Sequence, residues 1–238
     1  MEGVPQRALL VTPHPDDAES GCGGTAAKWI AAGAEVYYLI CTNGDKGSGD
    51  FTMASDRLAA IRVEEQMDAA HVLGVKDVMF LHHPDGTLED DHQLRSEVVR
   101  AIRKYRPDTV MCMDPYRSRG HTHRDHRVSG QVAIDAVCSF AWRPGYFPEQ
   151  IRDENLQPHL VNELYLWGSE DPDLFVDISE HIDMKVNALK RHASQINDPS
   201  GRGDRIRARS RSVGERAGLP YAEGFRVLHF EPQLPWGD

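Results

Sequence analysis

The feature that most constrains the fold is a repeated alternation between short apolar runs and longer segments with helical spacing of apolar residues. The apolar runs occupy residues 8–12, 35–41, 77–81 and 109–113. The helical segments between them occupy residues 24–32, 54–73 and 93–105. This alternation is typical of a parallel sheet that is covered by helices. We therefore predict an α/β fold with a single Rossmann-like domain, a mostly parallel sheet and helices on both faces.

The second half of the chain continues this pattern less regularly. We expect helices over 127–140 and 179–194 and strands over 160–167 and 174–178. Residues 142–158 are rich in Pro, aromatic and charged residues, which indicates an irregular segment that forms a lid or a wall. Residues 201–218 hold six arginines, and they form either a mobile solvated loop or a flap or subunit contact over an acidic site. We treat residues 1–238 as one domain.

The composition argues against several classes of partner. The formal net charge is −10, whereas a nucleic-acid binder that uses a broad basic face needs clustered Lys and Arg. The first residues contain no apolar segment long enough for a signal peptide or a membrane span. We therefore expect a cytoplasmic protein with a small-molecule partner, no nucleic acid and no membrane span. The four cysteines are scattered singly, and we expect them to be buried reduced thiols.

Ligands of such sheets bind beyond the carboxyl ends of the strands, so the loops there are the places to search for chemistry. The loop after the first predicted strand contains His14, Asp16 and Asp17. An imidazole and a carboxylate three residues apart can bind one cation where the chain turns, and zinc accepts both ligand types. Asp16 would then remain free beside the metal. The alternative is structural, because Pro15 and Asp16 also suit a turn or a helix N-terminus.

A second cluster follows the fourth predicted strand. Between Asp114 and His126 the chain contains three histidines and a further aspartate, which are His121, His123, His126 and Asp125. A catalytic zinc site uses three protein ligands and keeps one position open for water or substrate. The residues therefore predict a site made of His14, Asp17 and one histidine of this loop.

At this point the sequence resembles the LmbE-like, or PIG-L-like, family of zinc-dependent N-deacetylases. The resemblance covers most of the chain. It depends on a His-Pro-Asp-Asp loop at residues 14–17 and a His-x-Asp-His element at residues 123–126. Further matches are the Thr42-Asn43-Gly44-Asp45-Lys46-Gly47 loop, the Arg62-Val63-Glu64-Glu65 segment, the Pro84-Asp85-Gly86 turn and Tyr221-Ala222-Glu223-Gly224-Phe225.

The resemblance implies a role for each matching residue. His14, Asp17 and His126 are the expected ligands of Zn²⁺, and Asp16 is the expected general base. His123 would stabilise the oxyanion or protonate the departing amine, oriented by Asp125. Alternatively, His123 is a polar neighbour that supports the metal ligands. The expected substrate is a small N-acetylated molecule such as an amino sugar, and relatives often assemble, so a homo-oligomer is also expected.

Some positions are less clear. Glu19 stands one residue later than the glutamate that commonly follows the two aspartates of the family. His121 replaces a tyrosine that helps to hold the oxyanion in some relatives, so either His121 or Tyr116 would take that role. Arg62 and Asp85 resemble positions that hold sugar hydroxyls. Their alternative roles are an ion pair with Glu65 for Arg62 and a turn aspartate for Asp85.

Two other functions are compatible with parts of the sequence. Residues 21–26 fit a loose G-x-G-x-x-A pattern of nucleotide-binding modules, but the segment containing His14 separates these glycines from the strand. We therefore attribute the glycines to tight helix packing. A metal-dependent phosphoesterase is the other alternative, and it would need further carboxylates such as Asp45 and Asp114 for a second metal.

Overall fold

The computed structural model describes residues 3–119, 123–196 and 199–230, and these form one seven-stranded sheet between two layers of helices. The strand order is β3-β2-β1-β4-β5-β7-β6. The strands are β1 (Arg7–Thr12), β2 (Glu35–Thr42), β3 (Asp77–His83), β4 (Thr109–Met113), β5 (Glu163–Trp167), β6 (Leu174–Asp177) and β7 (Ala222–His229). Strands β1 to β5 pair in parallel, whereas β7 is antiparallel to both β5 and β6. The predicted α/β class and mostly parallel sheet are confirmed.

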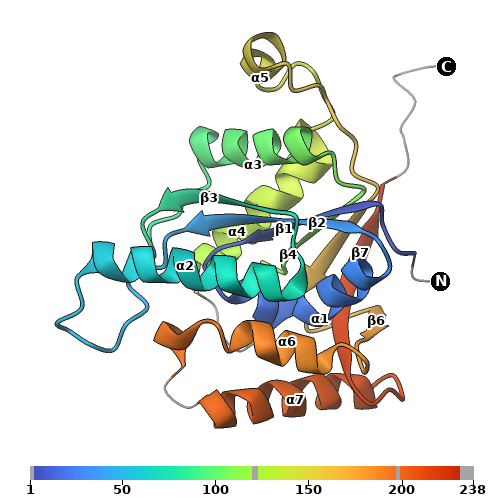
Figure 1. Ribbon diagram of the computed structural model, residues 1–238. Helices are drawn as coiled ribbons and strands as arrows, with labels where there is room; N and C mark the ends of the chain where they lie inside the picture. Colours follow the sequence, from blue (N-terminus) through green and yellow to red (C-terminus); the bar gives the residue numbers. More distant parts are fainter. Residues whose placement is uncertain (1–2, 120–122, 197–198, 231–238) are drawn as a thin grey trace.

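Helices cover both faces of the sheet (Figure 1). The helices are α1 (Asp17–Ala31), α2 (Ser55–Leu73), α3 (His92–Tyr105), α4 (Arg124–Asp135), α5 (Pro148–Glu154), α6 (Ile182–Leu189) and α7 (Pro199–Glu215). Helices α3 and α4 pack together on one face, and α1, α2 and α6 pack on the other, with α7 beside α6 and against β6 and β7. Among the described residues, no helix is both long and apolar enough to cross a membrane.

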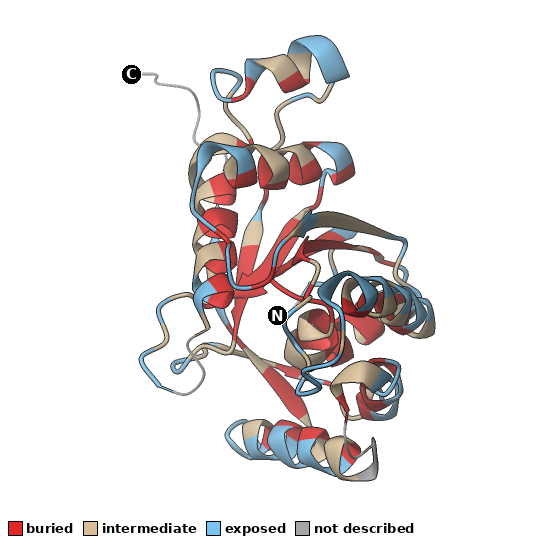
Figure 2. Cartoon of the chain, turned by 90° about the vertical axis from the view of Figure 1, so that its left-hand side faces the viewer, coloured by how far each residue is buried: buried red, intermediate tan, exposed pale blue. Residues whose placement is uncertain are grey.

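The core lies on the central strands and on the helix faces that pack against them (Figure 2). All five residues of β4 are buried, as are all residues of β1 except Arg7. This explains why both strands are continuous apolar runs rather than alternating ones. Cys22, Cys41 and Cys112 are buried in this core, as expected, while Cys138 is only partly buried.

Several predicted boundaries are wrong in the first half of the chain. Helix α1 begins at Asp17 rather than at residue 24, and Cys22 interrupts it with a non-helical φ of −144°. The glycines in this helix are required by packing, because a Cβ on Gly21 would meet the Trp167 indole and one on Gly24 would meet Ile178. Helix α4 begins at Arg124 rather than at 127 and ends in a π-helical turn, Ala136–Phe140.

The largest correction concerns residues 201–218, which are not a loop. They form most of α7 and its C-terminal turn. Over residues 201–215 of α7 the buried positions are Gly203, Ile206, Ser210 and Gly214, which have helical spacing but only one large apolar side chain. Apolar periodicity therefore could not reveal this helix.

Smaller differences follow in the same half of the chain. Residues 142–158 contain the short helix α5, and the helix expected over 179–194 is limited to α6 and a 3-10 turn, Ala193–Gln195. Strand β5 begins at Glu163 rather than at residue 160. Strand β7 was not predicted, although residues 221–225 were noted as a motif.

Gly130 provides a test of the packing between α4 and β4. A Cβ at this position would lie 2.3 Å from the Met113 carbonyl oxygen. We expect Gly130→Ala to lower the free energy of unfolding by about 1–3 kcal/mol through overpacking, although alanine favours helix formation. The matched control is Gly145→Ala, where a Cβ meets nothing within 4 Å. Chemical denaturation measures both variants, and equal stability of the two would contradict this packing.

Candidate metal centre and active site

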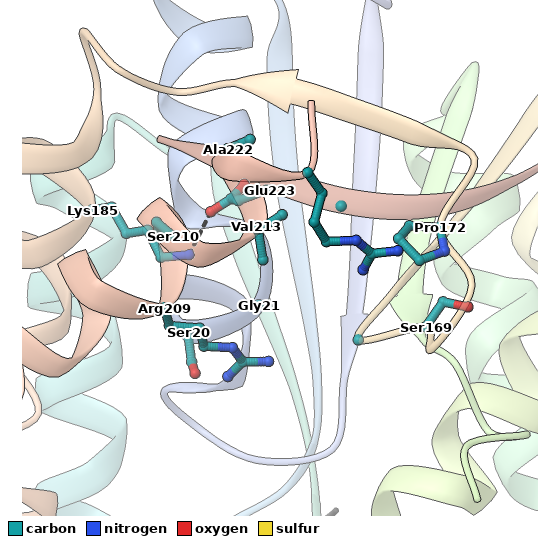
Figure 3. A pocket seen from close by; sticks show the side chains of 13 residues that line it. Ser20, Gly21, Ser169, Pro172, Lys185, Arg209, Ser210, Val213, Ala222 and Glu223 are labelled. Carbon is teal, nitrogen blue, oxygen red and sulfur yellow. Dashed lines mark hydrogen bonds and ion pairs between the residues drawn. The ribbon is translucent and has the colours of Figure 1, made fainter. Parts of the chain in front are cut away.

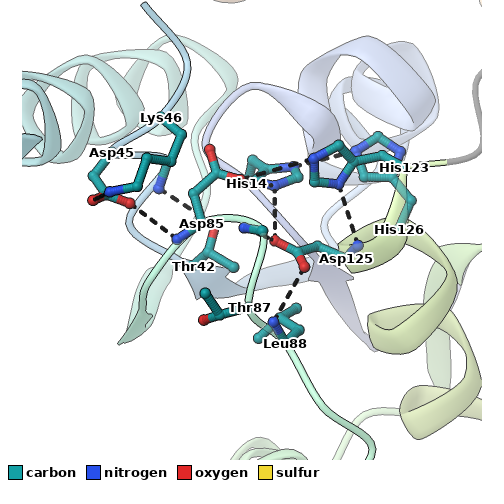
Figure 4. A network of polar contacts seen from close by, with 12 residues as sticks. His14, Thr42, Asp45, Lys46, Asp85, Thr87, Leu88, His123, Asp125 and His126 are labelled. Carbon is teal, nitrogen blue, oxygen red and sulfur yellow. Dashed lines mark hydrogen bonds and ion pairs between the residues drawn. The ribbon is translucent and has the colours of Figure 1, made fainter.

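The polar residues lie where the strand order reverses. β1 pairs in parallel with β2 on one side and with β4 on the other. At such a point the connections leave in opposite directions, and a crevice opens beyond the carboxyl ends of the strands. The loop after β1 carries His14 and Asp17, and the loop after β4 leads to His123 and His126. The two distant motifs therefore meet at one edge of the sheet (Figure 4).

Three candidate ligand atoms converge on one point. His14 Nδ1 lies 3.1 Å from Asp17 Oδ2 and 3.2 Å from His126 Nε2, and His126 Nε2 lies 3.3 Å from Asp17 Oδ2. Ligand atoms about 2.0–2.1 Å from one tetrahedral ion are separated from each other by roughly 3.3–3.4 Å. The triangle formed by His14, Asp17 and His126 thus has nearly the size that a single zinc ion requires.

The charges around His14 also fit a cation. Burial alone would lower the pKa of His14, but hydrogen bonds to Asp125, Asp17 and Asp85 raise it to about 11. Burial would raise the pKa of Asp17, but contacts with His126 and His14 hold it well below its usual range. Three carboxylates around one buried imidazole need a compensating positive charge, which a proton or a divalent metal ion can supply. The donor set therefore fits a divalent metal.

The Asp125 carboxylate contacts His14, whereas we had expected it to orient His123. Its Oδ2 atom lies 3.3 Å from His14 Nε2, and its carboxylate accepts backbone hydrogen bonds from Gly86 at 2.6 Å and from Leu88 at 3.2 Å. Asp85 Oδ1 lies 3.0 Å from the same nitrogen of His14. Both carboxylates thus hold the outer nitrogen of His14, which leaves Nδ1 facing Asp17 and His126.

His123 lies at the rim of this cluster. It caps α4, and its Nδ1 accepts the Asp125 backbone N–H at 3.2 Å. Its Nε2 lies 4.0 Å from Asp85 Oδ1, and its side chain is 34% exposed. Burial and the charge of His14 lower the pKa of His123. Because Nδ1 accepts a hydrogen bond, the neutral ring carries its proton on Nε2.

Asp16 is adjacent to the cluster in a strained conformation. Its φ of 94° and ψ of −19° lie in the left-handed region, which is uncommon for a residue other than glycine. Its carboxylate lies 3.8 Å from Arg62 and 3.6 Å from Arg202. Burial and the neighbouring Asp17 raise the pKa of Asp16 to about 6, against the opposing effect of Arg62.

Comparison with known proteins identifies the family. The family model described as PIG-L, GlcNAc-PI de-N-acetylase, matches residues 9–137. A diacetylchitobiose deacetylase of Thermococcus kodakarensis is 34% identical over 94% of this chain and 83% of its own length. The chain belongs to the PIG-L family.

Further PIG-L relatives agree with this assignment. A 1D-myo-inositol 2-acetamido-2-deoxy-alpha-D-glucopyranoside deacetylase of a Mycobacterium species is 28% identical over 82% of this chain and 76% of its own. The structure of N,N'-diacetylchitobiose deacetylase from Pyrococcus horikoshii superposes with a TM-score of 0.88 at 32% identity. The superposition covers 96% of this chain and 87% of the Pyrococcus horikoshii chain.

Arg62 of this PIG-L protein does not pair with Glu65. Its Nη2 donates to the Pro15 carbonyl at 2.5 Å and its Nη1 to the Gly44 carbonyl at 3.0 Å. Glu65 instead accepts hydrogen bonds from the backbone and hydroxyl of Ser194. Arg62 is 3% exposed, so it joins the loops after β1 and β2 from within the protein.

The remaining sequence predictions have mixed outcomes. Asp85 occupies the turn before Gly86, which has a φ of 81°, and it contacts His14 as well. His121 lies outside the described residues. Tyr116 is 64% exposed and donates to Gln131 Oε1 at 3.0 Å. The structure thus gives Asp85 a partner in the cluster, while the role of an oxyanion helper is not tested.

The sequence analysis did not identify the buried residues that hold the Asp16 backbone in place. The Gln66 side chain accepts the Asp16 backbone N–H at 3.0 Å and donates to Glu19 Oε1 at 2.9 Å. The other oxygen of Glu19 lies 3.3 Å from His192 Nε2. Gln66, Glu19 and His192 are all fully buried. Their spacing in the sequence does not reveal these contacts, because α1, α2 and the segment after α6 come together only in the folded protein.

A pocket opens beside the candidate metal ligands. Here it is called the inner pocket, and its walls include Asp17, Gly21, Arg117, His126, Trp167 and Arg209, around about 180 Å³ of space. One wall therefore comes from α7, in the part of the chain that we had expected to be irregular. An amide that reaches the ligand triangle can be accommodated there.

Gln66 tests this buried support. Gln66→Ala leaves the Asp16 N–H and the Glu19 carboxylate without this partner, so we expect a loss of about 1–3 kcal/mol in the free energy of unfolding. The matched control is Gln93→Ala, which removes an exposed hydrogen bond to Glu97 and should change stability by less than about 0.5 kcal/mol. Denaturant titration of both variants is the measurement. Equal stability of Gln66→Ala and the native protein would contradict the support assigned to Gln66.

Proposed function

We propose that the protein is a zinc-dependent hydrolase that removes the acetyl group from an N-acetylglucosamine unit of a small-molecule substrate. The observation that carries the proposal is the convergence of His14, Asp17 and His126 within hydrogen-bond distance of one another. Asp16 lies beside them with a raised pKa. The similarity to a diacetylchitobiose deacetylase and to a glucosaminyl-inositol deacetylase supports this chemistry.

The ligand triangle suits a catalytic metal better than a structural one. His14, Asp17 and His126 would hold Zn²⁺ through two nitrogens and one oxygen, and three protein ligands leave a position open. Zn²⁺ in such a site supplies Lewis-acid chemistry that polarises an amide carbonyl and makes water a stronger nucleophile at neutral pH. Asp85 and Asp125 keep His14 in the orientation that this requires.

Asp16 is the group we assign as general base. With a pKa of about 6, its carboxylate is ionised at neutral pH and is basic enough to accept a proton from the attacking water. The same proton can then pass to the nitrogen of the departing amine. The hydrogen bond from the Asp16 backbone to Gln66 fixes the left-handed turn that places this carboxylate beside the ligand triangle.

His123 is the group we assign to the oxyanion. Its lowered pKa keeps the ring neutral, and Nε2 carries the hydrogen because Nδ1 accepts the Asp125 backbone N–H. A neutral donor of this kind stabilises the negative charge that develops on the carbonyl oxygen. This geometry favours oxyanion stabilisation over proton donation to the amine.

The phosphoesterase alternative is less well supported. A second metal would need free carboxylates, but Asp45 accepts the Asp85 backbone N–H and contacts Lys46. Asp114 is buried and accepts the Tyr116 backbone N–H. Asp85 and Asp125 are engaged with His14. Asp45, Asp85, Asp114 and Asp125 are thus all engaged with other groups of the protein.

Two variants test the assigned roles. We expect Asp16→Asn to retain one metal ion per chain and to lose about 10²–10⁴-fold in turnover, because the amide cannot accept the proton. We expect His14→Ala to lose both the metal and the activity. Elemental analysis measures the metal, and amine release from diacetylchitobiose and simple N-acetylglucosaminides measures turnover.

Native turnover by Asp16→Asn would remove Asp16 from the mechanism. Activity of the native protein on a chromogenic phosphate ester, with none on the acetylated sugars, would select the phosphoesterase instead.

A further inference from the structure

A second hollow, here called the outer pocket, continues from the inner pocket. It lies between α1, α7 and the β5–β6 connection, and it shares Ser20, Gly21, Gly168 and Arg209 with the inner pocket. Figure 3 shows Arg209 of α7 beside Ser20 of α1, at the junction of the two hollows. A substrate with its amide at the ligand triangle can therefore extend past Arg209.

The inner pocket is positively charged once the metal ligands are set aside. The charged groups in its walls are Asp17, His126, Arg117 and Arg209, and the first two belong to the ligand triangle. Burial lowers the pKa of Arg117, and the nearby charge of Arg209 lowers it further, against the opposing effect of Asp114, Asp17 and Glu170. Arg117 and Arg209 line the same wall, so an anion between them would contact two guanidinium groups.

The outer pocket has the same excess of positive charge. Lys185 is paired with Glu223 at 2.5 Å, and Glu223 also accepts hydrogen bonds from Thr25, so these two charges cancel. Arg216 also lines this pocket, with its guanidinium over the Phe175 ring. Arg209 and Arg216 therefore leave a net positive charge in a protein whose formal net charge is −10.

Three arginines of α7 and the turn after it follow a regular spacing of seven residues, Arg202, Arg209 and Arg216. Arg202 and Arg209 therefore lie on one face of α7 about 10 Å apart, and Arg216 lies in the turn just after the helix. Arg202 contacts Asp16, Arg209 lies at the junction of the pockets and Arg216 lies in the outer pocket. This basic face runs from the proposed general base to the far end of the second hollow.

An unused hydrogen-bond donor lies in the same wall. Trp167 lines the inner pocket and is 2% exposed, and within the described ranges its indole N–H has no hydrogen-bond partner. Gly21 makes room for this indole, since a Cβ there would lie 2.5 Å from its nitrogen. This nitrogen is itself buried, so the wall offers a ligand rich in acceptor oxygens the guanidinium donors of Arg117 and Arg209.

We propose that Arg209, together with Arg117, forms a subsite for an anionic group on the part of the substrate attached to the acetylated sugar. This inference rests on the proposed deacetylase function and narrows its substrate class to anionic N-acetylglucosaminides. Carboxylate and phosphate share the geometry that a guanidinium binds with two parallel hydrogen bonds. Arg209 and Arg117 select the anion, while the ligand triangle and Asp16 act on the amide.

The test compares Arg209→Met with Arg205→Met. Arg205 is an exposed residue of the same helix that does not line either pocket, so the two changes are chemically matched. The probes are N-acetylglucosamine 1-phosphate, the N-acetylglucosaminide of a dicarboxylic acid, and the neutral methyl N-acetylglucosaminide. The measured quantity is kcat/KM for each anionic probe divided by that for the neutral probe.

We expect the native enzyme to favour at least one anionic probe. The probe that it favours shows whether the subsite binds a phosphate or a carboxylate. Arg209→Met should lower the ratio about tenfold or more, whereas Arg205→Met should leave it unchanged. The native preference should also weaken as ionic strength rises. An equal ratio in both variants, or a native preference for the neutral probe, would overturn the subsite.

A binding measurement distinguishes a failure of the anion subsite from a failure of the proposed deacetylase function. Calorimetry with the Asp16→Asn protein measures the affinity for each probe without turnover. Tighter binding of an anionic probe that is lost in Asp16→Asn/Arg209→Met supports the subsite even if no probe is deacetylated. Deacetylation of the neutral probe with equal affinity for all three probes would overturn the subsite and leave the deacetylase intact.

Discussion

The concentration of carboxylates around one buried imidazole is the constraint on which the rest of the site depends. His14 contacts Asp17 through Nδ1 and Asp85 and Asp125 through Nε2. Burying this much negative charge is costly unless a positive charge accompanies it. The sheet also brings His126 to Asp17 from the loop after β4, which completes a set of three candidate ligands for a metal ion. A divalent ion at the triangle would offset two of these three negative charges while both imidazoles stay neutral.

The surrounding protein holds this arrangement from several sides. Asp16 keeps a left-handed backbone because Gln66 binds its N–H and Arg62 binds the preceding carbonyl. Strain of this kind persists only where the neighbouring structure over-determines it. Helix α7 forms one wall of the inner pocket through Arg209, and its Arg202 lies near the Asp16 carboxylate. The chemistry, the strained turn and the substrate wall are thus parts of one electrostatic arrangement.

The sequence predicted the parts of this arrangement that are local. The bounds of β4 were correct because residues 109–113 form an apolar run between Pro107 and Asp114. The two histidine motifs were found because each follows a strand. The partner of Asp125 was missed because the turn at Gly86 and the start of α4 meet only in the tertiary structure. Helix α7 was missed because its buried face is built mainly from glycine and serine.

A crystal grown with Zn²⁺ and measured on both sides of the zinc absorption edge tests the central claim most directly. The account predicts one anomalous peak about 2.0–2.2 Å from His14 Nδ1, an Asp17 carboxylate oxygen and His126 Nε2. A peak between His14 Nε2, Asp85 and Asp125, which also form a possible metal-binding group, would contradict it. The absence of any peak within reach of His126 would contradict it equally.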